Sequence, residues 1–181
     1  MKFPRLLERP LSRLNAETAL CTVFFAGAAF SATPEWAQFR GPYGNGISDA
    51  INVPTTWSPE NGVAWNVEIP GKGWSSPVLS GGRIYLTSAV ADAAGEIGLN
   101  AVCLDQATGN ILWNREVLRP EAGEAAKMHR KNTAASPTPI VANGRIYVHF
   151  GHMGTAALDL AGNILWTQTS LKYTPVHGTG G

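Results

Sequence analysis

Apolar and polar residues alternate along much of this chain, in short runs that end at glycine, proline or asparagine. Alternation with a period of two places every second side chain on one face of a β-strand. Such runs predict strands at residues 63–69, 76–79, 83–87, 100–104 and 111–117, and no segment beyond the N-terminal region has a convincing helical period. Glycine and Asx residues between the runs supply the positive φ angles that hairpins require. The pattern predicts an all-β fold of antiparallel strands.

This strand pattern occurs twice. The phrase LDQATGNILW at residues 104–113 returns with one deletion as LDLAGNILW at residues 158–166. The upstream segment SPVLSGGRIYL at residues 76–86 likewise matches TPIVANGRIYV at residues 138–148. A unit that recurs about every fifty residues builds the same supersecondary structure each time. Four antiparallel strands with a recurring aromatic residue are typical of a β-propeller blade, so we expect a partial propeller of about two blades.

The repeated phrase resembles the tryptophan-docking repeat of the PQQ-like, or quinoprotein-type, β-propeller family. The resemblance covers residues 60–181, and the preceding leader is similar to the openings of secreted members. It implies that an Asp and a Thr-Gly pair shape the hairpin between the last two strands of a blade, while the closing Trp packs between adjacent blades. These structural roles fall on Trp65, Asp105, Thr108, Gly109, Trp113, Asp159, Gly162 and Trp166. The second copy has Ala161 in place of the Thr, which predicts a tighter turn.

The N-terminal residues have the pattern of a targeting segment. A basic stretch precedes an apolar run at residues 19–30 that is too short to span a bilayer, and small residues follow at the positions that a signal peptidase reads. We expect a signal peptide at residues 1–31, an irregular leader at 32–59 and propeller blades at 60–181. The alternative is a membrane-anchoring helix that is never cut. Cleavage would leave no stable transmembrane segment and would place the protein in the periplasm or outside the cell.

The expected number of blades is small for a propeller. Propellers close with about four to eight blades, and two blades alone would leave apolar strand faces and edges exposed. We therefore expect the chain to be an N-terminal fragment, truncated at its C-terminus, of a longer protein. The alternative is a short chain that completes a ring by self-association.

Composition narrows the class of protein. The chain has 181 residues, of which 44% are hydrophobic and 15% are charged, a balance that favours a globular protein over a disordered one. Its net charge of +1 provides no electrostatic track for nucleic acid. Removal of the predicted signal, which contains Cys21, would leave Cys103 without a disulfide partner. We expect Cys103 to be a buried strand residue rather than a reactive thiol.

Candidate chemistry is sparse along the sequence. A polar cluster of His129, Lys131 and Asn132 lies in the loop before the second blade, where it could face a ligand or could bond only to neighbouring backbone. The segment Gly71-Lys72-Gly73 is a short glycine-rich turn without the spacing of a phosphate-binding loop. No serine or cysteine has the base and orienting acid that nucleophilic catalysis needs, so no catalytic residue is assigned.

Two histidines could suggest a metal site. His149 and His152 lie three positions apart, but the sequence places no carboxylate or third histidine nearby. Strand residues at this spacing also point to opposite faces. We therefore expect no metal site at these residues.

Taken together, these features favour a binding or assembly scaffold over an enzyme, with a protein partner or a small ligand in the propeller channel. A parallel is the branch of the family whose propellers hold partners during outer-membrane β-barrel assembly. The alternative is an N-terminal fragment of a PQQ-dependent alcohol- or sugar-type dehydrogenase. No cofactor site is evident in this sequence, and PQQ with Ca²⁺ is expected only if further blades supply the site.

Overall fold

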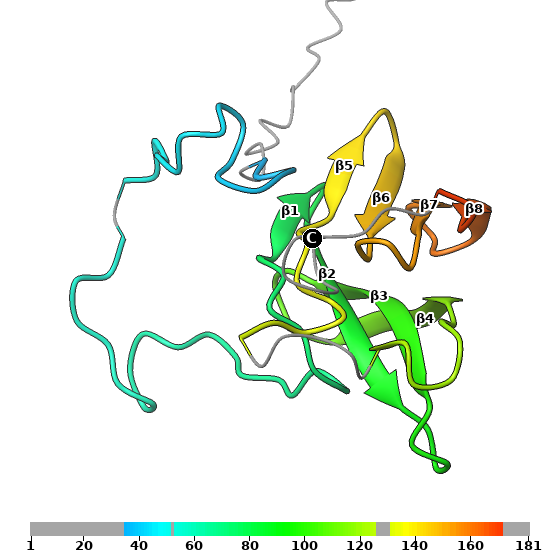
Figure 1. The fold of residues 1–181 in the computed structure, drawn as a ribbon. Helices are drawn as coiled ribbons and strands as arrows, with labels where there is room; N and C mark the ends of the chain where they lie inside the picture. Colours follow the sequence, from blue (N-terminus) through cyan, green and yellow to red (C-terminus); the bar gives the residue numbers. More distant parts are fainter. Residues whose placement is uncertain (1–34, 52, 126–130, 172–181) are drawn as a thin grey trace, which may run out of the picture. The chain divides into compact units, whose positions relative to one another are not determined.

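Strands joined by tight turns dominate the computed structural model of the chain (Figure 1). The structure describes residues 35–51, 53–125 and 131–171, all of which belong to one compact unit, Ala32–Gly181. In these ranges, no helix has the length and apolar character needed to cross a membrane. The strands of the described ranges are β1 Val78–Ser80, β2 Arg83–Ala91, β3 Ile97–Asp105, β4 Ile111–Leu118, β5 Ile140–Ala142, β6 Arg145–His149, β7 Thr155–Asp159 and β8 Ile164–Gln168.

The strands form two four-stranded antiparallel sheets, in the orders β1-β2-β3-β4 and β5-β6-β7-β8. Each sheet is a meander, because strands that follow one another in sequence are neighbours in the sheet. The first strands of the two sheets, β1 and β5, contact each other, and so do the last strands, β4 and β8. Two sheets with this topology and this side-by-side contact are successive propeller blades. The predicted all-β partial propeller with about two blades is confirmed.

The sequence repeat corresponds to a repeat in strand register. In each blade the pairing of the third strand with the fourth is interrupted by a β-bulge, between Cys103 and Leu104 in blade 1 and between Ala157 and Leu158 in blade 2; blade 1 has a further shift between Leu99 and Asn100. Trp113 pairs with Cys103 on one side of the first bulge, and Trp166 pairs with Ala157 at the equivalent place in the second blade. A bulge increases the local twist of a strand. The same bend therefore recurs next to each of these tryptophans.

A single hydrophobic core joins the two blades. Tyr85, Leu99 and Cys103 of blade 1 belong to the same cluster of buried side chains as Ile146 and Phe150 of blade 2. Seven consecutive residues of β3 are buried, so this strand is covered on both of its faces. Each blade thus buries its apolar surface against its neighbour, as stacked repeat units generally do.

Cys103 lies at the centre of this core. Its side chain is fully buried, and burial raises the pKa of the thiol to about 11. A thiol with a raised pKa is protonated at neutral pH and is a poor nucleophile. The expectation of a buried strand cysteine is confirmed.

Residues 63–69 are not a strand, contrary to the prediction from their alternation. Trp65, Val67 and Ile69 are half-buried while the residues between them are exposed, so the alternation does mark a packed face. A strand also needs a hydrogen-bonded neighbour, and no backbone hydrogen bond joins this segment to a strand of the described ranges. Here a period of two indicates burial without pairing.

The leader contacts the first strands of both blades. Trp36 and Leu79 of β1 exchange two backbone hydrogen bonds, of 2.8 and 3.0 Å. The carbonyl of Ala37, the next residue, accepts a hydrogen bond of 2.8 Å from the backbone N–H of Val141 in β5. Adjacent residues of the leader thus bond to β1 and to β5.

Candidate functional site

The turn between the last two strands of blade 2 is held by side chains of blade 1. The Trp113 indole N–H donates to the carbonyl of Leu160 at 3.4 Å, and Arg83 donates to the same oxygen at 2.7 Å. Arg115 donates to the carbonyl of Gly162 at 3.2 Å. The Trp113 ring lies so close to Gly162 that a Cβ at this glycine would come within 2.9 Å of it. This turn is therefore part of the contact between the blades.

The turn of blade 1 makes the equivalent contact with the segment that precedes the blade. The Trp65 indole N–H donates to the carbonyl of Gln106 at 3.1 Å, and its ring covers Gly109. Trp166, the third tryptophan in this series, is 44% exposed and packs beside Tyr147 with their ring centroids 6.3 Å apart. Trp65 and Trp113 thus each cover a glycine in the turn of the blade that follows.

The aspartates of the two turns accept hydrogen bonds within their own loops. In blade 1, Asp105 Oδ1 accepts from the N–H and the hydroxyl of Thr108, both at 2.8 Å. In blade 2, Asp159 Oδ2 accepts from the amide Nδ2 of Asn163 at 2.8 Å, so Asn163 replaces the missing threonine hydroxyl. These hydrogen bonds, first to the Thr108 hydroxyl and to the Asn163 amide, hold the pKa of both carboxyls below the ordinary value. Each carboxylate therefore stabilises the turn to which it belongs.

A pocket of about 290 Å³ lies where the loops of the two blades meet. The loop before β1 and the loop before β5 are joined at Ala135, whose carbonyl accepts from the N–H groups of Trp74 at 3.0 Å and Ser75 at 3.2 Å. The hairpin between β2 and β3 supplies another wall. We call this the loop-face pocket, and its lining residues are Lys72, Ala89, Gly95, Ile97, Ala125, Asn132, Thr133 and Ala134.

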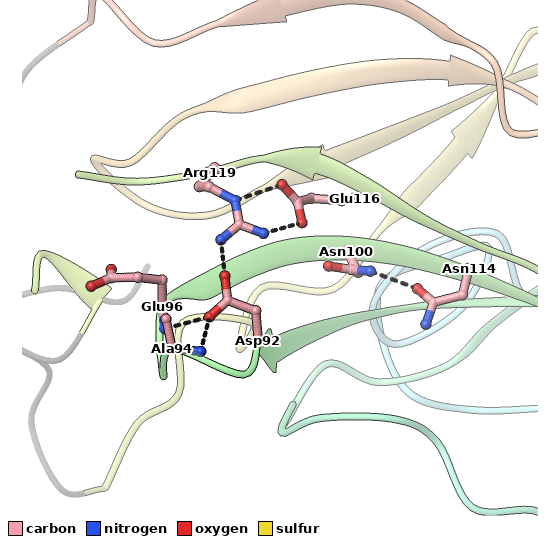
Figure 2. Close-up of polar contacts among 7 residues, drawn as sticks. All are labelled: Asp92, Ala94, Glu96, Asn100, Asn114, Glu116 and Arg119. Carbon is pink, nitrogen blue, oxygen red and sulfur yellow. Dashed lines mark hydrogen bonds and ion pairs between the residues drawn. The ribbon is translucent and has the colours of Figure 1, made fainter. Parts of the chain in front are cut away.

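An ion-pair network holds the β2–β3 hairpin that walls the pocket. Asp92 accepts from the backbone N–H groups of Ala94 and Glu96, each at 3.0 Å. Figure 2 shows Arg119 between Asp92 and Glu116, with N–O distances of 2.8 Å to Asp92 and 2.6 Å to Glu116. The Arg119 guanidinium holds the pKa of Asp92 below its usual range. Because these groups are exposed, the network orients the hairpin more than it stabilises the fold.

One residue of the predicted polar cluster lines the pocket. Asn132 does so, and its Oδ1 accepts a hydrogen bond of 2.9 Å from the Ser136 hydroxyl, which leaves the amide Nδ2 as a donor. Lys131 is exposed beside it, and His129 lies outside the described residues. The structure therefore places one member of the cluster, Asn132, at the pocket wall.

Sequence reasoning missed the contribution of Lys72 to the pocket. The backbone of Lys72 exchanges hydrogen bonds of 2.9 and 2.8 Å with Ala89 of β2. The chain bends at Pro70 and Gly71, where the φ of Gly71 is 88°, and Lys72 then forms an isolated antiparallel bridge with Ala89. Its flanking glycines were the available signal, since glycine allows a close approach of two backbones.

His149 and His152 contact different residues. His149 Nδ1 is 2.8 Å from the hydroxyl of Thr155 on the neighbouring strand. His152 Nε2 is 3.1 Å from a carboxylate oxygen of Glu124, which belongs to the connection between the blades. The spacing of residues along the chain did not predict this carboxylate near His152. In the part of the chain that the structure describes, no three His, Cys, Asp or Glu side chains cluster as metal ligands would.

Acidification is expected to destabilise the fold through His149. Burial lowers the pKa of this imidazole from its ordinary value of 6.5, so the unfolded chain binds a proton more readily than the folded chain. The contribution of neutral His149 to the free energy of unfolding is fully present above pH 6.5. It is lost as the pH falls from 6.5 towards the lower pKa that His149 has in the folded state. Urea unfolding of His149→Asn, which keeps a polar partner for Thr155, should show a smaller loss between neutral and mildly acidic pH. Equal losses in both proteins would contradict this assignment.

Comparison with known proteins places the chain among propellers. Residues 55–178 match the family model described as outer membrane protein assembly factor BamB. The solved structure titled europium-containing methanol dehydrogenase matches with 18% identity and a TM-score of 0.53, over 77% of this chain and 23% of its own. Quinohemoprotein alcohol dehydrogenase from Comamonas testosteroni matches with 21% identity and a TM-score of 0.57, over 84% of this chain and 22% of its own. No curated protein matches in sequence. The chain thus spans less than a quarter of each of these structures, and the likeness concerns the fold.

Proposed function

Because this chain belongs to the PQQ-like β-propeller family represented by outer membrane protein assembly factor BamB, we propose that it forms part of an exported propeller that serves as a binding scaffold. The loop-face pocket is the observation that carries the proposal. It lies where the connections of both blades and a hairpin held by ion pairs meet. Binding residues are often found on loops that a rigid scaffold positions. The bound molecule is a protein partner or a small ligand in the propeller channel.

The second candidate function is that of a PQQ-dependent dehydrogenase of the alcohol or sugar type, of which this chain would be the N-terminal part. The two solved dehydrogenases with this fold favour it. PQQ is a polycarboxylate, but among the described residues that line the loop-face pocket Lys72 is the single cation. The described residues also contain no cluster of metal ligands suited to Ca²⁺. They do not fit the cofactor, so residues outside the described ranges would have to hold it.

Purification of the complete protein from its native cells separates the two functions. After mild cross-linking in the cells, we expect the scaffold to carry defined partners in constant ratio to itself. A preparation loaded with PQQ and Ca²⁺ should then leave an electron-accepting dye unreduced in the presence of primary alcohols or aldose sugars. PQQ-dependent reduction of the dye would instead support the dehydrogenase.

Export makes a separate prediction about the N-terminus. Cleavage after Ser31 is expected, so the mature protein should begin at Ala32, as determined by intact mass and N-terminal sequencing. Ala29→Leu should block this cleavage, because the peptidase reads a small residue there. Phe30→Leu changes the position between the two recognised residues and should be processed normally. An unprocessed natural protein would contradict the signal-peptide prediction.

A further inference from the structure

We propose that the loop-face pocket binds a small organic anion, a single carboxylate on an apolar body, with the Lys72 ammonium as its charge partner and the Asn132 amide as a second donor. The inference rests on the proposed binding role and gives that role a ligand class. Four features of the described residues carry it: the fixed position of Lys72, its charge, the apolar walls and the volume of the pocket.

The glycines on either side of Lys72 fix its position. A Cβ at Gly71 would collide with the carbonyl oxygen of Ala89, and a Cβ at Gly73 would come within 2.5 Å of the carbonyl oxygen of Thr87. The segment therefore lies against β2 more closely than other residues would allow. Together with the two backbone hydrogen bonds to Ala89, this contact sets the Lys72 backbone beside the pocket. A lysine held in this way loses less backbone freedom when it binds a ligand.

The charge of Lys72 is not taken up by an ion pair with another described residue. Glu124 pairs with His152, while Asp92 and Glu116 pair with Arg119. No acidic side chain belongs to the pocket lining in those ranges. An anionic ligand group is thus complementary to the charge at the pocket.

The turn of the β2–β3 hairpin has two acidic residues, Asp92, which pairs with Arg119, and Glu96. Glu96 lines a neighbouring hollow of about 120 Å³ with Pro120 and Glu121, and this hollow shares Gly95, Ile97 and Ala125 with the loop-face pocket. The carboxylates of the hairpin and of the connection between the blades thus belong to this hollow or to ion pairs. The loop-face pocket keeps Lys72 as its charged lining residue in the part of the chain that the structure describes.

The remaining walls suit an apolar body. Ala89, Ala125 and Ala134 are less than one-tenth exposed, and Ile97 is half-buried. Small side chains at these positions leave room for a ligand and give it an apolar wall. Hydrogen bonds to a carboxylate are stronger than those between neutral groups, particularly beside an apolar wall. The volume of about 290 Å³ fits a small molecule or the last residue of a peptide.

Calorimetric titration of the complete protein tests the ligand class. The probes are hexanoate and hexanamide, which share the apolar chain and differ in the charge of the head group. We expect hexanoate to bind about tenfold or more tightly than hexanamide, since a hydrogen bond to a charged group contributes about 1.5–3 kcal/mol. Equal affinity for the two probes would overturn the proposal.

Three variants identify the residue that recognises the anion. Lys72→Gln should lower the affinity for hexanoate about tenfold or more, whereas Lys72→Arg keeps the charge and should retain most of it. Lys131→Gln removes the exposed cation beside Asn132 that does not line the pocket, and it should leave the affinity unchanged. Unchanged melting temperatures show that each variant is folded. An effect confined to Lys131→Gln would refute the assignment of Lys72.

A second pair of probes distinguishes a free acid from the end of a protein chain. Acetyl-alanyl-leucine with a free carboxyl terminus is compared with its amide. A preference for the free carboxyl in either pair supports the proposal, and the tighter of the two acids indicates the source of the natural ligand. This result is separate from the scaffold proposal, because loss of anion binding would leave the cross-linked partners in place. Dehydrogenase activity would contradict the scaffold proposal, whereas the titration results on anion binding would still stand.

Discussion

Replacing Trp113 by alanine is expected to lower the free energy of unfolding by about 3 kcal/mol, the lower end of the range for a buried tryptophan. The lower end applies because Trp113 is half-buried. Its ring covers Gly162 and its N–H donates to the carbonyl of Leu160, so the variant opens a cavity and leaves the turn of blade 2 without one of its donors. Denaturant unfolding of the complete protein measures the loss.

Trp57→Ala provides the matched control for this prediction. Trp57 is 69% exposed, so its replacement should change the free energy of unfolding by less than about 0.5 kcal/mol. A loss in Trp113→Ala as small as that in Trp57→Ala would place the Trp113 side chain on the surface. A loss below about 1 kcal/mol in Trp113→Ala alone would show that the contact between the blades does not depend on this ring.

Gly109→Ala should cost about 3 kcal/mol, for two separate reasons. Gly109 has a φ of 74°, a conformation that strains any residue with a Cβ. The new Cβ would also come within 2.5 Å of the Trp65 ring, and that ring is fixed by its hydrogen bond to Gln106. Backbone strain and overpacking therefore act together.

Gly82→Ala separates the two reasons. Gly82 also has a φ of 74°, but no atom lies within 4 Å of the Cβ position. This variant should lose only about 1 kcal/mol, the contribution of backbone strain. In a Trp65→Ala background the cost of Gly109→Ala should fall to a similar value, because the ring is gone. A cost that stays at about 3 kcal/mol without the ring would disprove the overpacking argument.

The strands and turns of the blades were predictable because their sequence pattern occurs in two copies along the chain. The local sequence pattern was sufficient to predict the roles of the turn residues. Asp105 accepts a hydrogen bond from Thr108, three positions later, and Gly109 contacts a single neighbouring ring. Residues 63–69 show the limit of this reasoning. Alternation depends on which side chains are buried, whereas a strand depends on a partner that may lie anywhere in the chain.

The candidate site was less accessible to sequence reasoning. Lys72, Ile97 and Asn132 come from three separate segments, and only the packing of the loop before β5 against the loop before β1 brings these segments together. The contact of Glu124 with His152 also joins segments that no local pattern relates. Of the sequence features near the pocket, the glycines beside Lys72 were the informative ones, because they require a close backbone approach that only the fold explains.

The bonds of the leader to β1 and β5 also order the events of chain synthesis. A ribosome releases Trp36 and Ala37 early, yet their hydrogen-bond partners, Leu79 and Val141, follow later in the chain. About a hundred further residues must emerge before the leader can complete its hydrogen bonds to both strands. The leader is made before both blades but is fixed to both only after β5 has emerged, so its docking is coupled to the formation of blade 2.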